Sequence, residues 1–316
     1  MDTIAQTNGQ LAETDKIEFG NIAASSGAAS RLVIASYNIR YAAGKYLISG
    51  GLLRRVGLLP TGRRSENIAR NIDLAAKAFS SGRLLPTVDV LALQEADKET
   101  GRAGRHHIAR ELAESLEMAW IHVPSGLPRG VEPQKRQWWF SFEEQIELYD
   151  QGDTGLGLLS RYPIQDVVRI DLPWSECPWR PRLSVGATIR VGNETICLFN
   201  SHIDPHSSAG GQIEQLEVVL EHALKSDRSI FLGDFNTLSK RKCLEVRRLL
   251  ESAGYETPFP TGTPTWRGAG LRMHADWIFV RNLKVGRWGV ARPLGVSDHW
   301  PIWIEIQLGS DGYRLK

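Results

Sequence analysis

The chain has 316 residues, of which 42% are hydrophobic and 23% charged, and its formal net charge at pH 7 is +2. This composition is typical of a globular protein with a sizeable core and excludes general disorder, while the net charge is too small to indicate nucleic acid or acidic lipid as a partner. The three cysteines show no Cys-x-x-Cys spacing, which argues against a disulfide framework or a zinc cluster and favours a reducing, cytoplasmic compartment.

The first 30 residues are rich in Ala, Ser, Asn and Gln and lack the basic start and apolar run of a signal peptide. We therefore predict a flexible leader over 1–30 and a single domain over 31–316. Because no uncharged apolar stretch approaches the roughly 20 residues that span a bilayer, we expect a soluble or peripheral protein, which we take to be a monomer.

Ordered structure is predicted to begin with a strand over 32–37, a β-prone run that places Asn38 at its end. Ser65 is expected to cap a helix whose apolar residues recur at helical spacing until Gly82 ends it. These two elements open a chain in which polar residues follow apolar strands.

The same arrangement recurs further along. A strand over 88–93 leads to Glu95, and a hairpin of strands over 184–191 and 195–201 leads to His202. The other predicted elements are helices over 107–118, 212–225 and 242–253 and strands over 156–160, 229–232, 276–280 and 302–306. Helices and strands mix without strict alternation, so the pattern favours an α+β fold of two packed mixed sheets flanked by helices over a doubly wound sheet.

Polar and acidic side chains gather at the ends of these strands. They are Asn38, Glu95, His202, Asp234, Asn236, Asp276, Asp298 and His299. Each alone has an ordinary structural explanation, such as a turn residue or a structural histidine. Together they form an oxygen-rich set that suits Mg²⁺ first, and also Mn²⁺ or Ca²⁺, and they supply the base and donors that phosphoester cleavage needs.

The order of the motifs carries a family resemblance. The motifs are SYNIR (36–40), LQE (93–95), GLLSRYPI (157–164), NSHID (200–204), LGDFN (232–236), ADWIF (275–279) and SDH (297–299). The series resembles the endonuclease/exonuclease/phosphatase superfamily, related to deoxyribonuclease I, over about residues 31–308. The resemblance implies a four-layer αββα sandwich with its site at one rim of the two sheets, and a metal-dependent phosphoric ester hydrolase whose catalytic domain is 31–316.

The resemblance also implies a role for each site residue. Asn38 and Glu95 match metal-site residues, with Glu95 as the direct ligand, and Asp298 is assigned to the metal as well. His202 is expected to contact the phosphate. Asp234 is expected to orient or deprotonate the attacking water.

The remaining roles concern the phosphoryl group. Asn236 is expected to donate a hydrogen bond to a phosphoryl oxygen, and if the chain stays extended it shares one side with Asp234. His299 is expected to bind or protonate the phosphoryl group, with Asp276 or Asp298 as its carboxylate partner.

One further residue, and one difference from the family's usual motifs, concern the substrate. Arg182 stands where many family members carry a phosphate-facing arginine, although a surface ion pair is an equal explanation and Arg180 an equal local competitor. The chain lacks a clear active-site tyrosine before Gly157, so Asp153 or Thr154 is expected in that space, which puts a repair-nuclease identity in doubt.

The substrate itself is left open by the sequence. Residues 40–70 hold seven basic residues and one acidic residue, and within them 45–64 could contact an anionic membrane, line a substrate groove, or pack on the domain. We slightly favour a nuclease-like phosphodiesterase over a sphingomyelinase-like or inositol phosphate hydrolase. A serine hydrolase is a distant alternative, because no Gly-x-Ser-x-Gly elbow is present.

Overall fold

Two mixed β-sheets form the centre of the protein. The computed structural model describes residues 16–20, 27–44, 63–126, 146–147, 149–173, 181–268 and 270–309. In the seven-stranded sheet the order is β1 (Glu18–Gly20), β4 (Ala119–Pro124), β5 (Gly155–Ser160), β3 (Val90–Gln94), β2 (Arg31–Asn38), β14 (Ile302–Gln307) and β13 (Lys284–Val290). In the five-stranded sheet it is β12 (Asp276–Arg281), β9 (Ser229–Asp234), β8 (Glu194–His202), β7 (Leu183–Val191) and β6 (Ile164–Asp171).

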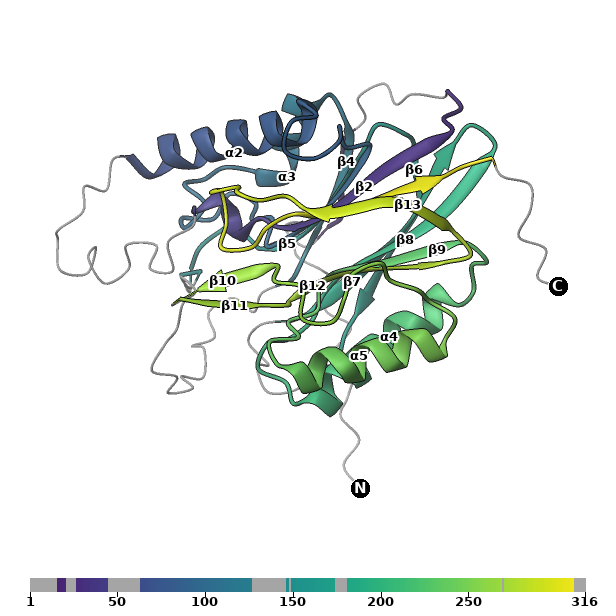
Figure 1. The fold of residues 1–316 in the computed structure, drawn as a ribbon. Helices are drawn as coiled ribbons and strands as arrows, with labels where there is room; N and C mark the ends of the chain where they lie inside the picture. The colour runs from purple at the N-terminus through teal and green to yellow at the C-terminus, as the bar shows by residue number, and fades with distance from the viewer. Residues whose placement is uncertain are drawn as a thin grey trace.

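Helices cover the outer face of each sheet (Figure 1). Helices α2 (Arg64–Ser80) and α3 (Ile108–Leu116) pack on the seven-stranded sheet, and α4 (Ala209–Ala223) and α5 (Lys240–Ser252) pack on the five-stranded sheet. A short 3-10 turn, η2 (Arg40–Ala42), follows β2, and a small hairpin of β10 (Trp266–Gly268) and β11 (Leu271–Met273) lies at one end of the sandwich. The predicted α+β fold, a four-layer αββα sandwich, is confirmed.

Alternation along β2 shows why the layers form. Leu32 and Ile34 pack between the two sheets, whereas Val33, Ala35 and Tyr37 pack against the helices on the other face. Successive side chains of a strand point to opposite faces, so an almost continuously apolar strand is needed where both faces are covered. The chain therefore has three apolar layers, one between the sheets and one beneath each helix pair.

Helix starts differ from the predicted ones in ways that capping explains. Ser65 lies inside α2, whose N-cap is Arg63 with no side-chain hydrogen bond, so the predicted cap is wrong. Helix α4 begins three residues earlier than predicted because Ser208 accepts a hydrogen bond from the backbone N–H of Gly211. Ser239 caps α5 in the same way.

The predicted flexible leader is wrong over Glu18–Gly20, which form the edge strand β1 against β4. The Glu18 carboxylate anchors this strand by contacts with Lys98 and with His107 Nε2, the latter at 3.0 Å. Residues 1–15 lie outside the described residues. Strands β4, β6 and β13 were not predicted, since β4 follows α3 closely and the other two are edge strands with mixed polar character.

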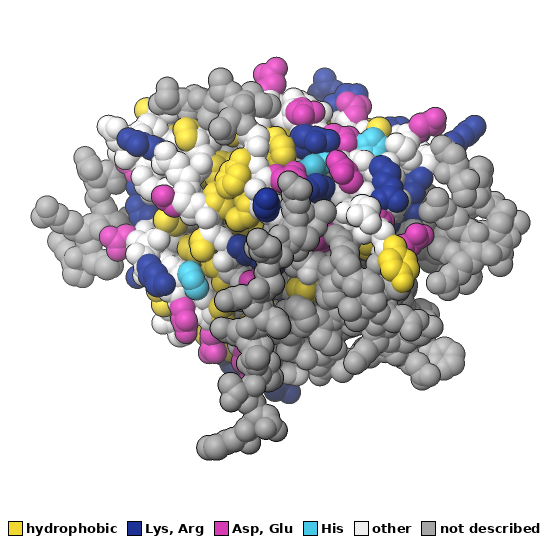
Figure 2. Space-filling view, turned by 180° about the vertical axis from the view of Figure 1, so that it is seen from behind, with side chains coloured by type: hydrophobic (Ala, Val, Ile, Leu, Met, Phe, Trp, Pro, Cys, Tyr) yellow, Lys and Arg dark blue, Asp and Glu magenta, His cyan; other side chains and the backbone are white. Residues whose placement is uncertain are grey.

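The surface gives little indication of a partner by itself. On the face shown in Figure 2, acidic and basic side chains of the described residues lie interspersed, in keeping with the small net charge. Among the described helices, none has the length and apolar composition needed to cross a lipid bilayer. The predicted contact segment 45–64 falls almost entirely outside the described residues.

Candidate active site

The strand ends converge at one rim of the sandwich, as predicted. Strands β2 and β3 run parallel, as do β8 and β9, so the carboxyl ends of each pair lie side by side. In register, His202 lies beside Asp234, and Asp234 lies beside Asp276 at the start of β12. Asn38 and Glu95 reach the same rim from the other sheet.

The Asn38 amide joins the two sheets at this rim. Its Nδ2 donates to Glu95 Oε1 at 3.1 Å and to Asp234 Oδ2 at 2.8 Å, while its Oδ1 accepts from the backbone N–H of Arg40 at 3.0 Å. One buried amide thereby holds two carboxylates close together. Such an arrangement is stable only if the negative charge is compensated nearby.

The positive charges nearest to this pair of carboxylates are those of Arg182, which contacts the His202 ring, and of His299. His202 Nε2 lies 3.6 Å from Asp234 Oδ2 and 3.9 Å from Glu95 Oε1. Arg182 Nη1 lies 2.9 Å from both ring nitrogens of His202, and Arg182 is only 8% exposed. Glu95, His202 and Arg182 line one cavity, so Arg182 is part of the site and the surface ion pair is not its role.

Thr154 also lines this cavity, as a small polar residue in the region where a tyrosine was looked for and not found. Asp153, the other candidate for the space before Gly157, accepts a hydrogen bond from Gly126 N–H at 3.0 Å and is not a lining residue. Of the two predicted occupants, the structure therefore favours Thr154. Arg180 lies outside the described residues.

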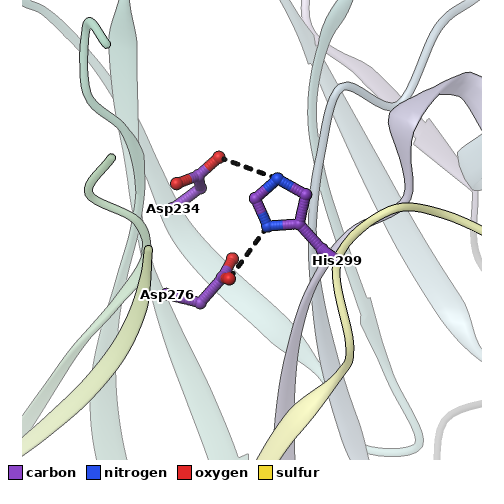
Figure 3. Close-up of side chains that lie close together, drawn as sticks. All are labelled: Asp234, Asp276 and His299. Atoms are coloured by element: carbon purple, nitrogen blue, oxygen red, sulfur yellow. Dashed lines mark hydrogen bonds and ion pairs between the residues drawn. The ribbon is translucent and has the colours of Figure 1, made fainter. Parts of the chain in front are cut away.

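Asp234, Asp276 and His299 form a buried ion-pair group, with the two carboxylates on one sheet and the imidazole reaching in from the other (Figure 3). His299 Nδ1 lies 2.9 Å from Asp276 Oδ2, and its Nε2 lies 3.7 Å from Asp234 Oδ2. Burial lowers the pKa of His299, but the charges of Asp276 and Asp234 raise it, and the result is a pKa of about 10. His299 is therefore an imidazolium at neutral pH.

Asp234 is shifted in the way that suits a base. Burial raises the pKa of Asp234, the positive charge of His299 lowers it and the negative charge of Asp276 raises it, which leaves the pKa at about 7. These three side chains also lie close enough together to hold a cation. Both nitrogens of the His299 imidazolium are donors, so without a cation His299 acts as the counter-ion of the two carboxylates.

The two carboxylates proposed as partners of His299 have separate functions. Asp276 is the partner. Asp298 instead lies 3.5 Å from Arg40 Nη1 and accepts hydrogen bonds from Trp266 Nε1 at 3.1 Å and from Ser297 Oγ at 3.2 Å. The alternative pairing of His299 with Asp298 is therefore wrong, because His299 Nδ1 contacts Asp276 while the Asp298 carboxylate is held by Arg40, Trp266 and Ser297.

The prediction that an extended chain places Asn236 on the same side as Asp234 is wrong. The chain does not stay extended after β9, because Asn236 has a φ of 51° and its N–H donates to Asp234 Oδ1 at 2.9 Å. Its Nδ2 donates to Ile203 O at 2.9 Å, so one amide hydrogen is used within the protein. The turn, and not strand alternation, brings Asn236 to the rim.

Three residues that the sequence did not assign to the site support it from behind. Arg40 holds Asp298, Thr265 Oγ1 accepts from Asp276 N–H at 2.9 Å, and Ser297 Oγ donates to Asn38 O at 2.8 Å. Arg40 and Ser297 belong to the quoted motifs and could have been suspected. Thr265 lies in no motif, and only the pairing of distant segments reveals it.

Comparison with known proteins decides the family. The model of the endonuclease/exonuclease/phosphatase family matches residues 35–299, a range that includes every site residue described above. The chain belongs to this family. Its members hydrolyse phosphoesters, and the chain is accordingly a phosphoester hydrolase. The comparison with curated proteins found no match.

Solved structures of the same family share the fold at low sequence identity. A protein of Beutenbergia cavernae DSM 12333 aligns with a TM-score of 0.62 and 17% identity, over 89% of this chain and 72% of its own. TDP2 of D. rerio, complexed with single-strand DNA product, has a TM-score of 0.54 and 16% identity over 88% and 100%. ANGEL2, a 2',3'-cyclic phosphatase in complex with adenosine-2',3'-vanadate, has a TM-score of 0.55 and 13% identity over 92% and 98%.

Proposed function

We propose that this phosphoester hydrolase is a Mg²⁺-dependent, nuclease-like phosphodiesterase. The observation that carries the proposal is the surroundings of one carboxylate. Asp234 lies at once against Asn38, His202 and His299, beside a cavity that Glu95 and Arg182 line. A base, two imidazoles and a guanidinium thus converge on one point, as the hydrolysis of an anionic phosphodiester requires.

The residues at the rim fit a hard divalent cation. The metal-binding groups at the rim include the carboxylates of Glu95 and Asp234, which accept hydrogen bonds from the same Asn38 amide nitrogen. Oxygen ligands of this kind suit Mg²⁺ or Mn²⁺ and not a thiolate metal. Glu95 would hold the ion as the direct ligand, with Asn38 and Asp298 as the further proposed ligands, and the ion when bound would neutralise charge on the phosphoryl oxygens.

Proton handling falls to Asp234 and His299. With a pKa of about 7, Asp234 is a suitable acceptor for the proton of an attacking water. His299, kept protonated and oriented by Asp276, faces the same carboxylate and stabilises its ionised form, which is the form able to accept the proton. His202, Arg182 and the remaining amide hydrogen of Asn236 are positioned to donate to phosphoryl oxygens as negative charge builds up.

The preference for a nucleotide phosphodiester is supported by the ligands bound to two structurally similar proteins. TDP2 was solved with single-strand DNA product and ANGEL2 with an adenosine vanadate. We carry that preference over to this chain as part of the proposal. Phospholipid and inositol phosphate substrates belong in the same screen, since they share the scissile phosphoester.

The test is hydrolysis of bis(4-nitrophenyl) phosphate and of a single-stranded oligonucleotide, each with Mg²⁺ and with excess EDTA. Glu95→Gln should weaken metal binding by roughly tenfold or more, because even outer-shell partners of a metal site contribute that much. Calorimetric titration with Mn²⁺ measures this binding directly. Exposed Glu114, on helix α3, gives the matched control Glu114→Gln. Full turnover in chelator would refute the metal requirement, and turnover of phospholipid alone would refute the nuclease-like preference.

A further inference from the structure

Two arginines lie against Trp300, the residue that follows His299, and a third lies beside one of them. The guanidinium carbons of Arg267 and Arg292 lie 5.0 Å and 4.6 Å from the centroid of the Trp300 ring. Trp300 is 5% exposed, so its indole acts as a fixed support under both cations. Arg272 is the third member, since it lies directly opposite Arg267 in the antiparallel pairing of β10 and β11.

This cluster is attached directly to the catalytic loop. Trp266 pairs with His299 as a β-bridge, and Arg267 N–H donates to Asp298 O at 3.0 Å. Trp300 N–H in turn donates to Thr265 O at 2.7 Å. The β10–β11 hairpin at the end of the sandwich therefore carries its arginines as part of the same rigid rim as the site (Figure 1).

The cluster lacks negative partners. Within the described residues, Arg267, Arg272 and Arg292 form no ion pair with a carboxylate. Ten other arginines of the described chain do so, namely Arg31, Arg40, Arg102, Arg105, Arg161, Arg169, Arg228, Arg241, Arg247 and Arg287. Arg272 and Arg292 are exposed and Arg267 is half-buried. Like charges held together without counter-charges repel one another, and a bound anion relieves this repulsion.

We propose that Arg267, Arg272 and Arg292 form a subsite for a second phosphate of the substrate, beside the phosphate that is cleaved. The inference rests on the proposed function and narrows it to substrates with more than one phosphate. Guanidinium groups bind phosphate through paired N–H donors, and Trp300 fixes two of them in place. The second phosphate belongs either to a neighbouring nucleotide of an oligonucleotide or to a small molecule that carries several phosphates.

The kinetic test uses a double variant, Arg272→Gln with Arg292→Gln, which removes the two exposed cations. Catalytic efficiency, kcat/KM, is compared for bis(4-nitrophenyl) phosphate, a single-stranded oligonucleotide and inositol hexakisphosphate. A substrate that uses the subsite should lose roughly tenfold in kcat/KM, whereas bis(4-nitrophenyl) phosphate, with a single phosphate, should be unaffected. The substrate that loses efficiency identifies the source of the second phosphate.

A matched control removes two exposed arginines elsewhere, Arg83→Gln with Arg190→Gln. Arg83 precedes β3 and Arg190 lies near the end of β7, so both are at the opposite end of the sandwich from Glu95 and Arg182. The control should leave all three substrates unchanged. The single variant Arg272→Gln, at an exposed side chain, serves if the double variant does not fold.

Binding is measured separately from turnover. Fluorescence anisotropy of a labelled oligonucleotide in EDTA, over a salt series, should give a log-log slope that falls by about 0.7 for each arginine removed. Competition with inositol hexakisphosphate extends this to the small ligand. Because no hydrolysis is involved, loss of affinity in the double variant supports the subsite even if the chain proves not to be a phosphodiesterase.

Three results would overturn the subsite. One is unchanged affinity and kcat/KM for both multiply phosphorylated ligands in the double variant. Another is an equal loss on bis(4-nitrophenyl) phosphate, which would mean that the arginines only support the catalytic loop. The third is a loss confined to phosphatidylserine vesicles, which would assign the cluster to a membrane surface.

Discussion

At the scale of single residues, the site depends on two titrating groups that face each other with opposite roles. Asp234 has a pKa of about 7 and His299 a pKa of about 10, so near neutral pH a carboxylate able to accept a proton faces an imidazolium that keeps its own. Pairs of groups whose environments move their pKa values apart are how one site supplies both base and acid chemistry. The two predictions at this scale follow from that pair.

Replacing either group should reduce turnover more than substrate binding. Asp234→Asn and His299→Ala are each expected to lower kcat by roughly 100-fold or more, because both act on charge that develops during the reaction. KM should change much less. Measured kcat is combined with a thermal melt for each variant, with the exposed Asp227→Asn as control. A normal kcat in well-folded protein would leave the two residues with a purely structural role.

The charge of Asp276 should set the alkaline limit of activity. The base must be deprotonated, so kcat/KM should fall below pH 7 as Asp234 binds a proton, at a lower pH if a cation is bound. It should fall again above pH 10 as His299 loses its proton. Asp276→Asn removes a charge that raises the pKa of His299, so the alkaline limb should move from near 10 toward 6.5. A pH–rate profile with an unmoved alkaline limb contradicts this.

At the scale of elements, the close approach of β8 and β9 decides how His202 and Asp234 come together. Gly233, with a φ of 138°, precedes Asp234, and a Cβ atom there would lie 2.0 Å from Ser201 O. No side chain fits this space without separating the two strands. The strand pair that presents His202 and Asp234 therefore requires a glycine at position 233.

Gly233→Ala should accordingly destabilise the protein by about 3 kcal/mol, the combined order of backbone strain and overpacking. Gly262→Ala is the matched control, because Gly262 also has a positive φ, of 89°, but nothing lies within 4 Å of its Cβ position. That variant should lose only about 1 kcal/mol. Urea denaturation of both proteins measures the difference, and equal losses would show that the contact with Ser201 is unimportant.

At the scale of the whole molecule, two buried histidines make stability depend on pH. Burial lowers the pKa of His122 and of His274 to about 3 in each case. His122 Nε2 contacts Ala96 O at 2.8 Å, and the His274 ring stacks on Trp277 at 3.7 Å. Both imidazoles are therefore buried and neutral, because their pKa values lie far below the usual value for histidine.

The free energy of unfolding should therefore decrease as the pH falls from 6.5 toward 3. In this window the unfolded chain binds a proton at each histidine and the folded chain does not, which costs about 1.4 kcal/mol per pH unit for each one. Above pH 6.5 neither state is charged there, so the effect vanishes. Urea unfolding of His274→Gln at pH 7 and pH 5 should show a shallower loss than the unsubstituted protein, with His222→Gln as comparison. An identical pH dependence would be evidence against a neutral His274.

The sequence by itself determined the fold class and pointed to the polar side chains that gather at the rim of the sandwich. Apolar residues at periods of two and 3.6 fix which segments become strands and helices, and these periods are local properties. The residues that follow the strands, such as Glu95, His202 and Asp234, are recognisable because carboxyl ends of adjacent parallel strands meet at one edge. Local pattern was sufficient for these features.

Only the tertiary structure decided how those side chains pair. In the structure Asp276, and not Asp298, contacts His299, and Trp266 pairs with His299. Arg182 lines the cavity. The structure also places Glu18–Gly20 in the sheet despite a composition typical of a leader. The physical reason is the same in each case: strand register and side-chain direction depend on contacts between segments far apart in the chain, and no local pattern specifies which distant segment a strand will meet.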